Sequence, residues 1–320
     1  MTRSSSLALA LIAASLAIGG AALAQKPAPK AAQPAAAVRD DKPQKIGVLE
    51  VRLPISAKRD KKFLSGLTQR NFEVYEDGTR QKIEKFIAPS QLPLDIGLLI
   101  DTSNSVKLKL PFEKDAGEDF VATVTTYRRR DKILLASFDS TVELHQDFTD
   151  NQELLIRALR KLRADGYTKL YDGVHRVIEE KMANLEDKEA RRIIVILSDG
   201  EDTASEHTLK DAIEMAQRYD VTIFGISTKN FKGVTSGLVE NADDKDLRRL
   251  CEETGGQVFL PSEKIELFKA FNEVALDLRQ EYVLFYQPTN QAKTAPKSRR
   301  IKVKLVGADA HLFHKQGYVY

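Results

Sequence analysis

Oxygen-bearing side chains follow an apolar run in the first third of the chain. Residues Leu94 to Ile100 are mostly apolar and end at Asp101, after which Ser103 and Ser105 occupy alternate positions. Such a run is typical of a strand buried on both faces, and open α/β sheets bind ligands at the carboxyl ends of their strands. One carboxylate and two hydroxyls are hard oxygen ligands that suit a divalent cation such as Mg²⁺. The same residue types also favour an ordinary strand-to-helix turn.

Two later segments supply more oxygen ligands for the same edge of the sheet. Asp199 follows a second apolar strand, so a parallel sheet would bring it to the edge where Asp101 lies. Thr168 stands at a turn between two expected helices, from which it can reach over that edge. Because hydroxyl ligands contribute no charge, a Mg²⁺ held by two carboxylates and three hydroxyls keeps positive character and an open coordination position. An acidic side chain of a partner protein is the natural ligand for that position.

The fold that would position these side chains is predicted from alternating strands and helices between residues 91 and 280. Strands are expected at 94–100, 133–138, 193–197, 221–226 and 258–260, with helices at 112–127, 150–162, 170–185, 208–219, 245–253 and 263–280. This alternation is typical of an α/β fold with a doubly wound, mainly parallel sheet. Residues 141–145 pair back across an Asp-Ser turn, which adds one antiparallel edge strand.

The segments on either side of this region have β patterns. In residues 45–90, the strand Phe72–Gly78 enters an Asp-Gly turn, and Ile83–Phe86 is expected as its hairpin partner. Residues 281–320 contain further alternating or apolar strands. Neither flank has enough strands to be stable alone. We therefore expect one small β-sandwich-like module formed from both flanks.

The amino-terminal residues 1–24 have the pattern of a secretory signal peptide. Arg3 precedes an apolar stretch from Leu7 to Ile18, and Ala22-Leu23-Ala24 forms a small-x-small cleavage site. Residues 25–44 are rich in Ala, Pro and Lys, which predicts a disordered linker. No second apolar stretch is long enough to span a membrane. We therefore expect an exported protein, either periplasmic or extracellular.

The charge balance of the chain indicates which kinds of partner it is expected to bind. The chain has 49 Lys and Arg against 46 Asp and Glu, and no basic cluster is interleaved with aromatic residues. Nucleic-acid binding is therefore not expected.

Cys251 is the only cysteine, which excludes an intramolecular disulfide. Its helical setting favours a buried, apolar role.

The three oxygen-bearing segments resemble the loops of a von Willebrand factor type A (VWA) domain. The likeness rests on Leu99-Ile100-Asp101-Thr102-Ser103-Asn104-Ser105, on Thr168 and on Leu197-Ser198-Asp199-Gly200. It implies a metal-ion-dependent adhesion site (MIDAS), usually occupied by Mg²⁺, with Mn²⁺ or Ca²⁺ as alternatives. The implied ligands are Asp101, Ser103, Ser105, Thr168 and Asp199. Relatives often carry glycine directly before the threonine, where this chain has Tyr167. This difference changes the expected shape of the rim of the site.

The flanks resemble those of the exported VWFA-related family first described from acidobacteria. This likeness rests on Gly66-Leu67-Thr68, on Asn71–Gly78 and on Gly317-Tyr318, and extends over residues 45–320. The resemblance implies a fold and a metal, but it brings no established biochemical activity.

Three classes of function remain open. A phosphotransferase of the haloacid dehalogenase type would need a second Asp where this chain has Ser103. The chain also lacks a Gly-x-Ser-x-Gly elbow, a phosphate-binding glycine loop and a His-Glu-x-x-His helix. The sequence therefore favours a non-enzymatic module that binds a partner's Asp or Glu through Mg²⁺. The alternatives are a structural protein with a non-functional metal site and a metal-dependent hydrolase.

Three further carboxylates near the expected loops have two possible roles. Glu201 and Asp202 follow Asp199, so they are expected either to surround the metal or to cap the next helix. Asp172 is expected to cap the helix that begins near it.

Overall fold

The computed structural model describes residues 50–89, 92–127, 130–187, 189–199, 201–231, 244–289 and 298–319. The expected signal peptide and linker lie outside these residues. Within them, every helix is too short or too polar to cross a membrane.

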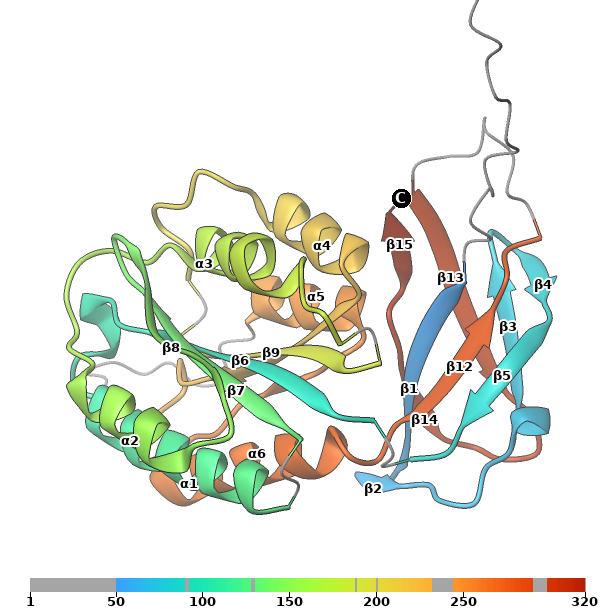
Figure 1. Ribbon diagram of the computed structural model, residues 1–320, viewed down its shortest axis with the longest axis horizontal. Coiled ribbons are helices and arrows are strands. Elements are labelled where there is room, and N and C mark those ends of the chain that lie inside the picture. The colour runs from blue at the N-terminus through green and yellow to red at the C-terminus, as the bar shows by residue number, and fades with distance from the viewer. Residues whose placement is uncertain are drawn as a thin grey trace, which may run out of the picture. The chain divides into compact units, whose positions relative to one another are not determined.

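A six-stranded sheet forms the centre of the α/β region (Figure 1). Its strand order is β11-β10-β9-β6-β7-β8, and only the β7–β8 pair is antiparallel. The strands are β6 (Leu94–Asp101), β7 (Lys132–Phe138), β8 (Val142–Thr149), β9 (Arg191–Ser198), β10 (Val221–Ser227) and β11 (Val258–Phe259). The expected mainly parallel sheet with one antiparallel edge strand is confirmed.

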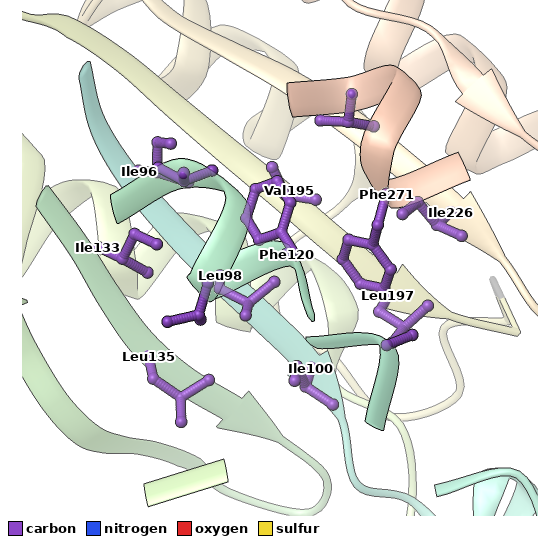
Figure 2. Close-up of a cluster of buried hydrophobic side chains, with 14 of the residues drawn as sticks. Ile96, Leu98, Ile100, Phe120, Ile133, Leu135, Val195, Leu197, Ile226 and Phe271 are labelled. Atoms are coloured by element: carbon purple, nitrogen blue, oxygen red, sulfur yellow. The ribbon is translucent and has the colours of Figure 1, made fainter. Parts of the chain in front are cut away.

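Helices cover both faces of this sheet. They are α1 (Leu110–Tyr127), α2 (Gln152–Lys161), α3 (Leu170–Val177) with its π-helical extension η3 (Ile178–Met182), α4 (Leu209–Arg218), α5 (Lys245–Thr254) and α6 (Lys264–Asp277). Leu98 and Ile100 of β6 pack into a cluster with α1, α2 and α6, which Figure 2 shows in part. Leu99 joins a second cluster with α3, α4 and α5 on the opposite face. Because successive strand residues point to opposite faces, all of β6 is buried.

The helices begin and end close to the expected positions. Helix α2 is capped by Asn151, whose side chain accepts a hydrogen bond from Leu154 N at 3.3 Å. Helix α4 begins with a capping box formed by Thr208 and Asp211. In α5, Cys251 is fully buried within the second cluster, which confirms its expected apolar role.

Two further sheets contain strands from both flanks of the α/β region. Their strand orders are β14-β1-β12-β5, with β2 beside β1, and β15-β13-β3-β4. The strands are β1 (Val51–Arg59), β2 (Lys62–Phe63), β3 (Phe72–Glu76), β4 (Thr79–Gln81), β5 (Ile83–Ile87), β12 (Tyr282–Tyr286), β13 (Ser298–Leu305), β14 (His311–Phe313) and β15 (Gly317–Val319). The pairs β1–β12 and β3–β13 join the two flanks. Leu53, Val74 and Tyr286 share one apolar cluster.

The hairpin expected between residues 72–78 and 83–86 is wrong. Strand β3 pairs with β4, with Glu76 opposite Thr79, whereas β5 pairs with β12 in the other sheet. Asp77 and Gly78 have φ angles of 46° and 82°, as a two-residue type I′ turn requires. The second strand of the hairpin therefore starts immediately after Gly78, before the residues Ile83–Phe86 on which the prediction was based.

Candidate metal centre

Three loops meet beyond the carboxyl ends of β6 and β9. The first loop (residues 101–109) follows β6 and contains a short 3₁₀ turn, η2 (Asn104–Val106). The second loop (162–169) joins α2 to α3, and the third loop (198–208) joins β9 to α4. Parallel pairing of β6 with β9 brings the first and third loops to one edge of the sheet.

Backbone hydrogen bonds join the first loop to the second. Asn104 N donates to Gly166 O at 3.1 Å, and Asp165 N donates to Thr102 O at 2.8 Å. Gly166 has a φ of 77°, and a Cβ atom there would lie 2.4 Å from Ser140 Oγ. Only glycine therefore allows the second loop to approach this closely.

Thr168 joins the second loop to the third. Its N–H donates to Thr203 Oγ1 at 3.0 Å, and its carbonyl accepts from Thr203 N at 2.9 Å and from Ala204 N at 3.1 Å. Thr168 is only 4% exposed. The three loops thus form one hydrogen-bonded unit, as their resemblance to a single site implies.

Asp101 is fully buried at the base of this unit. Its Oδ1 accepts from Ser103 N at 2.8 Å, and its Oδ2 accepts from Ser198 Oγ at 2.6 Å. Burial raises the pKa of Asp101 to about 6 against the lowering effect of the Ser198 and Ser103 hydrogen bonds, and the negative charge of Asp199 adds to the rise. The hydroxyl oxygens of Ser103 and Ser105 lie 2.8 Å apart. A cation here would relieve the cost of placing two carboxylates together.

The unit opens to solvent at Ser105, which is exposed, and at Asp199, which is partly buried. Lys109 Nζ lies 3.8 Å from Asp199 Oδ2. Within the described residues, no three His, Cys, Asp or Glu side chains are arranged to hold a metal. Any hard-metal site at these loops therefore depends on hydroxyl ligands as well as on its two carboxylates, and this donor set fits Mg²⁺.

Asp172 does not cap its own helix, so that expectation is wrong. The N-cap of α3 is Lys169. The carboxylate of Asp172 instead accepts from the backbone N–H groups of Glu206 and His207 at 3.0 to 3.1 Å. Asp172 therefore connects α3 to the third loop. Its carboxylate satisfies backbone N–H groups of that loop that lie outside regular secondary structure.

Glu201 and Asp202 do not cap helix α4 either, because its N-cap is Thr208. Glu201 forms an ion pair with Lys229 at 2.7 Å. Asp202 accepts a hydrogen bond from Tyr171 N at 3.3 Å. Both side chains therefore hold the third loop against neighbouring segments.

Two buried charged side chains beside the site were not identified from the sequence. Lys109 is 3% exposed and Glu113 is fully buried. Glu113 Oε1 accepts from Thr228 Oγ1 at 2.9 Å, and burial raises the pKa of Glu113 well above its ordinary value. Their four-residue spacing at the start of α1 was a visible signal of proximity. The sequence did not show that this helix face is covered by Thr228.

Integrin alpha-M from Mus musculus is similar to this chain, with 26% identity over 211 residues. The alignment covers 63% of this chain but only 17% of integrin alpha-M. The likeness therefore concerns a small part of a much longer protein.

Three solved structures match the chain at low sequence identity. A von Willebrand factor type A structure from Catenulispora acidiphila is 12% identical, with a TM-score of 0.48, covering 78% of this chain and 72% of that chain. The vWF domain of the type V pili tip protein Mfa5 from Porphyromonas gingivalis is 15% identical, with a TM-score of 0.46, covering 58% and 94%. Proximal thread matrix protein 1 from the mussel byssus, solved with a zinc-occupied MIDAS motif, is 17% identical, with a TM-score of 0.47, covering 60% and 49%.

The family model of the von Willebrand factor type A domain matches residues 95–273. This range includes all three loops and every strand and helix from β7 to α5. Because it covers more than half of the chain, the protein belongs to the von Willebrand factor type A domain family.

Proposed function

We propose that this protein is an exported, metal-dependent module that binds a partner protein. Its MIDAS would consist of five ligands, namely Asp101, Ser103, Ser105, Thr168 and Asp199. One observation carries the proposal: these oxygen-bearing side chains lie on three loops that hydrogen-bond to one another at one edge of the sheet. The remaining coordination position is left for an Asp or Glu of the partner.

The chain's own residues explain why a partner carboxylate is the preferred ligand. Mg²⁺, when bound, supplies a positive centre that attracts an anionic oxygen. Ser198 and the N–H of Ser103 orient Asp101 toward its neighbours. Two carboxylates balance the charge of the ion formally, but the three hydroxyl ligands add no negative charge, so the ion still attracts an anionic oxygen at its open position. Mn²⁺ and Ca²⁺ suit the same oxygen ligands and are the alternative ions.

Two exposed apolar side chains on the loops indicate what surrounds that carboxylate. Tyr167 is 71% exposed and Leu108 is 67% exposed, the highest values among the exposed large hydrophobic residues that the structure describes. Tyr167 directly precedes Thr168, and Leu108 directly precedes Lys109 in the first loop. Tyrosine is enriched among the residues that supply most of the binding energy of protein interfaces, and exposed apolar side chains close together mark interaction surfaces. We therefore propose that the partner carries apolar residues beside its acidic one.

Selection from a random peptide library displayed on phage tests this function. Peptides retained in Mg²⁺ and released by EDTA should contain Asp or Glu next to apolar residues. Thr168→Ala and Ser103→Ala should weaken their binding while leaving the circular dichroism spectrum unchanged, because each removes one neutral ligand. Binding that ignores EDTA would contradict the proposal and favour a structural protein with a non-functional metal site. Mg²⁺-dependent cleavage of the bound peptides would favour the hydrolase.

Replacement of Tyr167 separates partner binding from metal binding. Tyr167→Ala should weaken the binding of a selected peptide about tenfold, because tyrosine is enriched among the interface residues whose truncation costs most. The affinity of the Tyr167→Ala variant for Mg²⁺ should not change, because the Tyr167 side chain is mostly exposed and is not one of the proposed metal ligands. Both affinities can be measured by titration calorimetry.

Leu276→Ala is the matched control for Tyr167→Ala. Leu276 is 51% exposed but lies at the end of α6, away from the three loops. It should affect neither affinity. Equal peptide binding by wild type and Tyr167→Ala would exclude Tyr167 from the interface.

A further inference from the structure

Glu113 is a buried carboxylate with one unused oxygen. The side chain is fully buried, and its Oε1 accepts from Thr228 Oγ1 at 2.9 Å. Its Oε2 has no hydrogen-bond partner among the residues that the structure describes. Buried carboxylate oxygens are normally paired, because leaving one without a donor is costly. This oxygen therefore indicates a donor that reaches it in another state of the protein.

Lys109 is the nearest candidate for that donor along the chain. Glu113 N donates to Lys109 O at 3.1 Å in the first turn of α1, and side chains four residues apart lie on the same helix face. The positive charge of Lys109 also acts on Glu113 in the opposite sense to the charges of Asp101 and Asp199. Lys109 thus lies close enough to interact with both Glu113 and Asp199.

The ammonium group of Lys109 occupies a place where a metal ion would disturb it. Its Nζ lies 3.8 Å from Asp199 Oδ2, and the side chain is 4% exposed. A divalent cation bound to Asp199 would bring two like charges close together in a buried setting, where screening by water is weak. Because the Lys109 side chain is buried, its ammonium cannot simply move out into solvent. The unused oxygen of Glu113 provides an acceptor on the same helix face.

We propose that Lys109 is an internal competitor of the metal: its ammonium pairs with Asp199 when the metal is absent and with Glu113 Oε2 when the metal is bound. This inference rests on the proposed metal site. The exchange lowers the affinity of the site for the metal, because binding must first displace an ion pair. It also moves a side chain at the start of α1 whenever the metal binds or leaves.

A double-mutant cycle followed by Mg²⁺ titration calorimetry tests this proposal. Lys109→Met should bind Mg²⁺ about tenfold more tightly or better, because it removes the competing charge. Glu113→Gln should bind about tenfold more weakly, because it removes the negative charge that would pair with the displaced ammonium. In the Lys109→Met background, Glu113→Gln should have no effect beyond about twofold, since no ammonium remains to be accepted. Lys109→Gln serves as a second variant if Lys109→Met does not fold.

The possible outcomes distinguish this inference from the proposed function. Wild type that binds Mg²⁺ no more weakly than Lys109→Met or Lys109→Gln would overturn the inference and leave the metal site intact. An equal loss from Glu113→Gln in both backgrounds would show that Glu113 acts on the metal without Lys109, which also overturns it. Absence of Mg²⁺ binding in wild type and in both Lys109 variants would overturn the inference together with the proposed function.

Discussion

Asp101→Ala is expected to lower the affinity for Mg²⁺ by more than about a hundredfold, since even partners that only orient a metal ligand contribute 10- to 100-fold. The substitution removes a formal negative charge and a buried ligand that two hydrogen bonds hold in place. Titration calorimetry near pH 8 measures the change. At that pH Asp101 of the wild type is ionised, because its pKa is about 6.

Asp101→Asn is the matched control, because it keeps the shape of the side chain and removes only the charge. It should lose nearly as much affinity as Asp101→Ala. Glu201→Gln should lose little, because Glu201 is paired with Lys229 rather than with the loop carboxylates. Equal binding of Mg²⁺ by wild type and both Asp101 variants would place the metal elsewhere.

Truncation after residue 281 is expected to unfold the β strands that precede the α/β region. It removes β12, β13, β14 and β15, and with them the pairs β1–β12, β1–β14, β3–β13 and β5–β12. The deleted core side chains are Tyr282, Leu284, Tyr286, Ile301, Val303 and Tyr318. Loss of one large buried side chain costs about 2 to 5 kcal/mol, so the sum exceeds the net stability of about 5 to 15 kcal/mol of an ordinary domain. Exposed strand edges should then cause aggregation.

Size-exclusion chromatography and amide hydrogen exchange measure this effect. The control is full-length protein with Lys302→Ala, because Lys302 lies on the exposed side of β13. It should elute at the same volume as the wild type and keep its protection over residues 51–87. A truncated protein that is also free of aggregates, with unchanged protection over these residues, would show that the amino-terminal strands fold alone.

The sequence was most informative where burial leaves few choices. Leu94 to Ile100 and Ile193 to Leu197 are buried on both faces of the sheet, so their apolar runs show where each strand ends. Asp101 and Asp199 lie at those ends, and this explains why their common edge was predictable. Strand β4 was missed because Thr79–Gln81 is short and polar. Its pairing depends on the backbone angles of the turn rather than on an apolar pattern.

Side chains whose role depends on distant contacts could not be predicted. Asp172 has the residue type of a helix cap, but its carboxylate accepts from backbone N–H groups of the third loop. Glu113 is buried against Thr228, which is more than a hundred residues away in the chain. No local pattern encodes such a contact, because it arises only when α1 packs beside the end of β10.

Paramagnetic broadening of amide NMR signals by Mn²⁺ tests the central claim most directly. Sub-stoichiometric Mn²⁺ should broaden the signals of the first, second and third loops most strongly, and excess Mg²⁺ should restore them. The same addition to Asp199→Ala should leave these signals sharp. Broadening that persists in Asp199→Ala, or that is centred on residues outside the three loops, would contradict a metal site there.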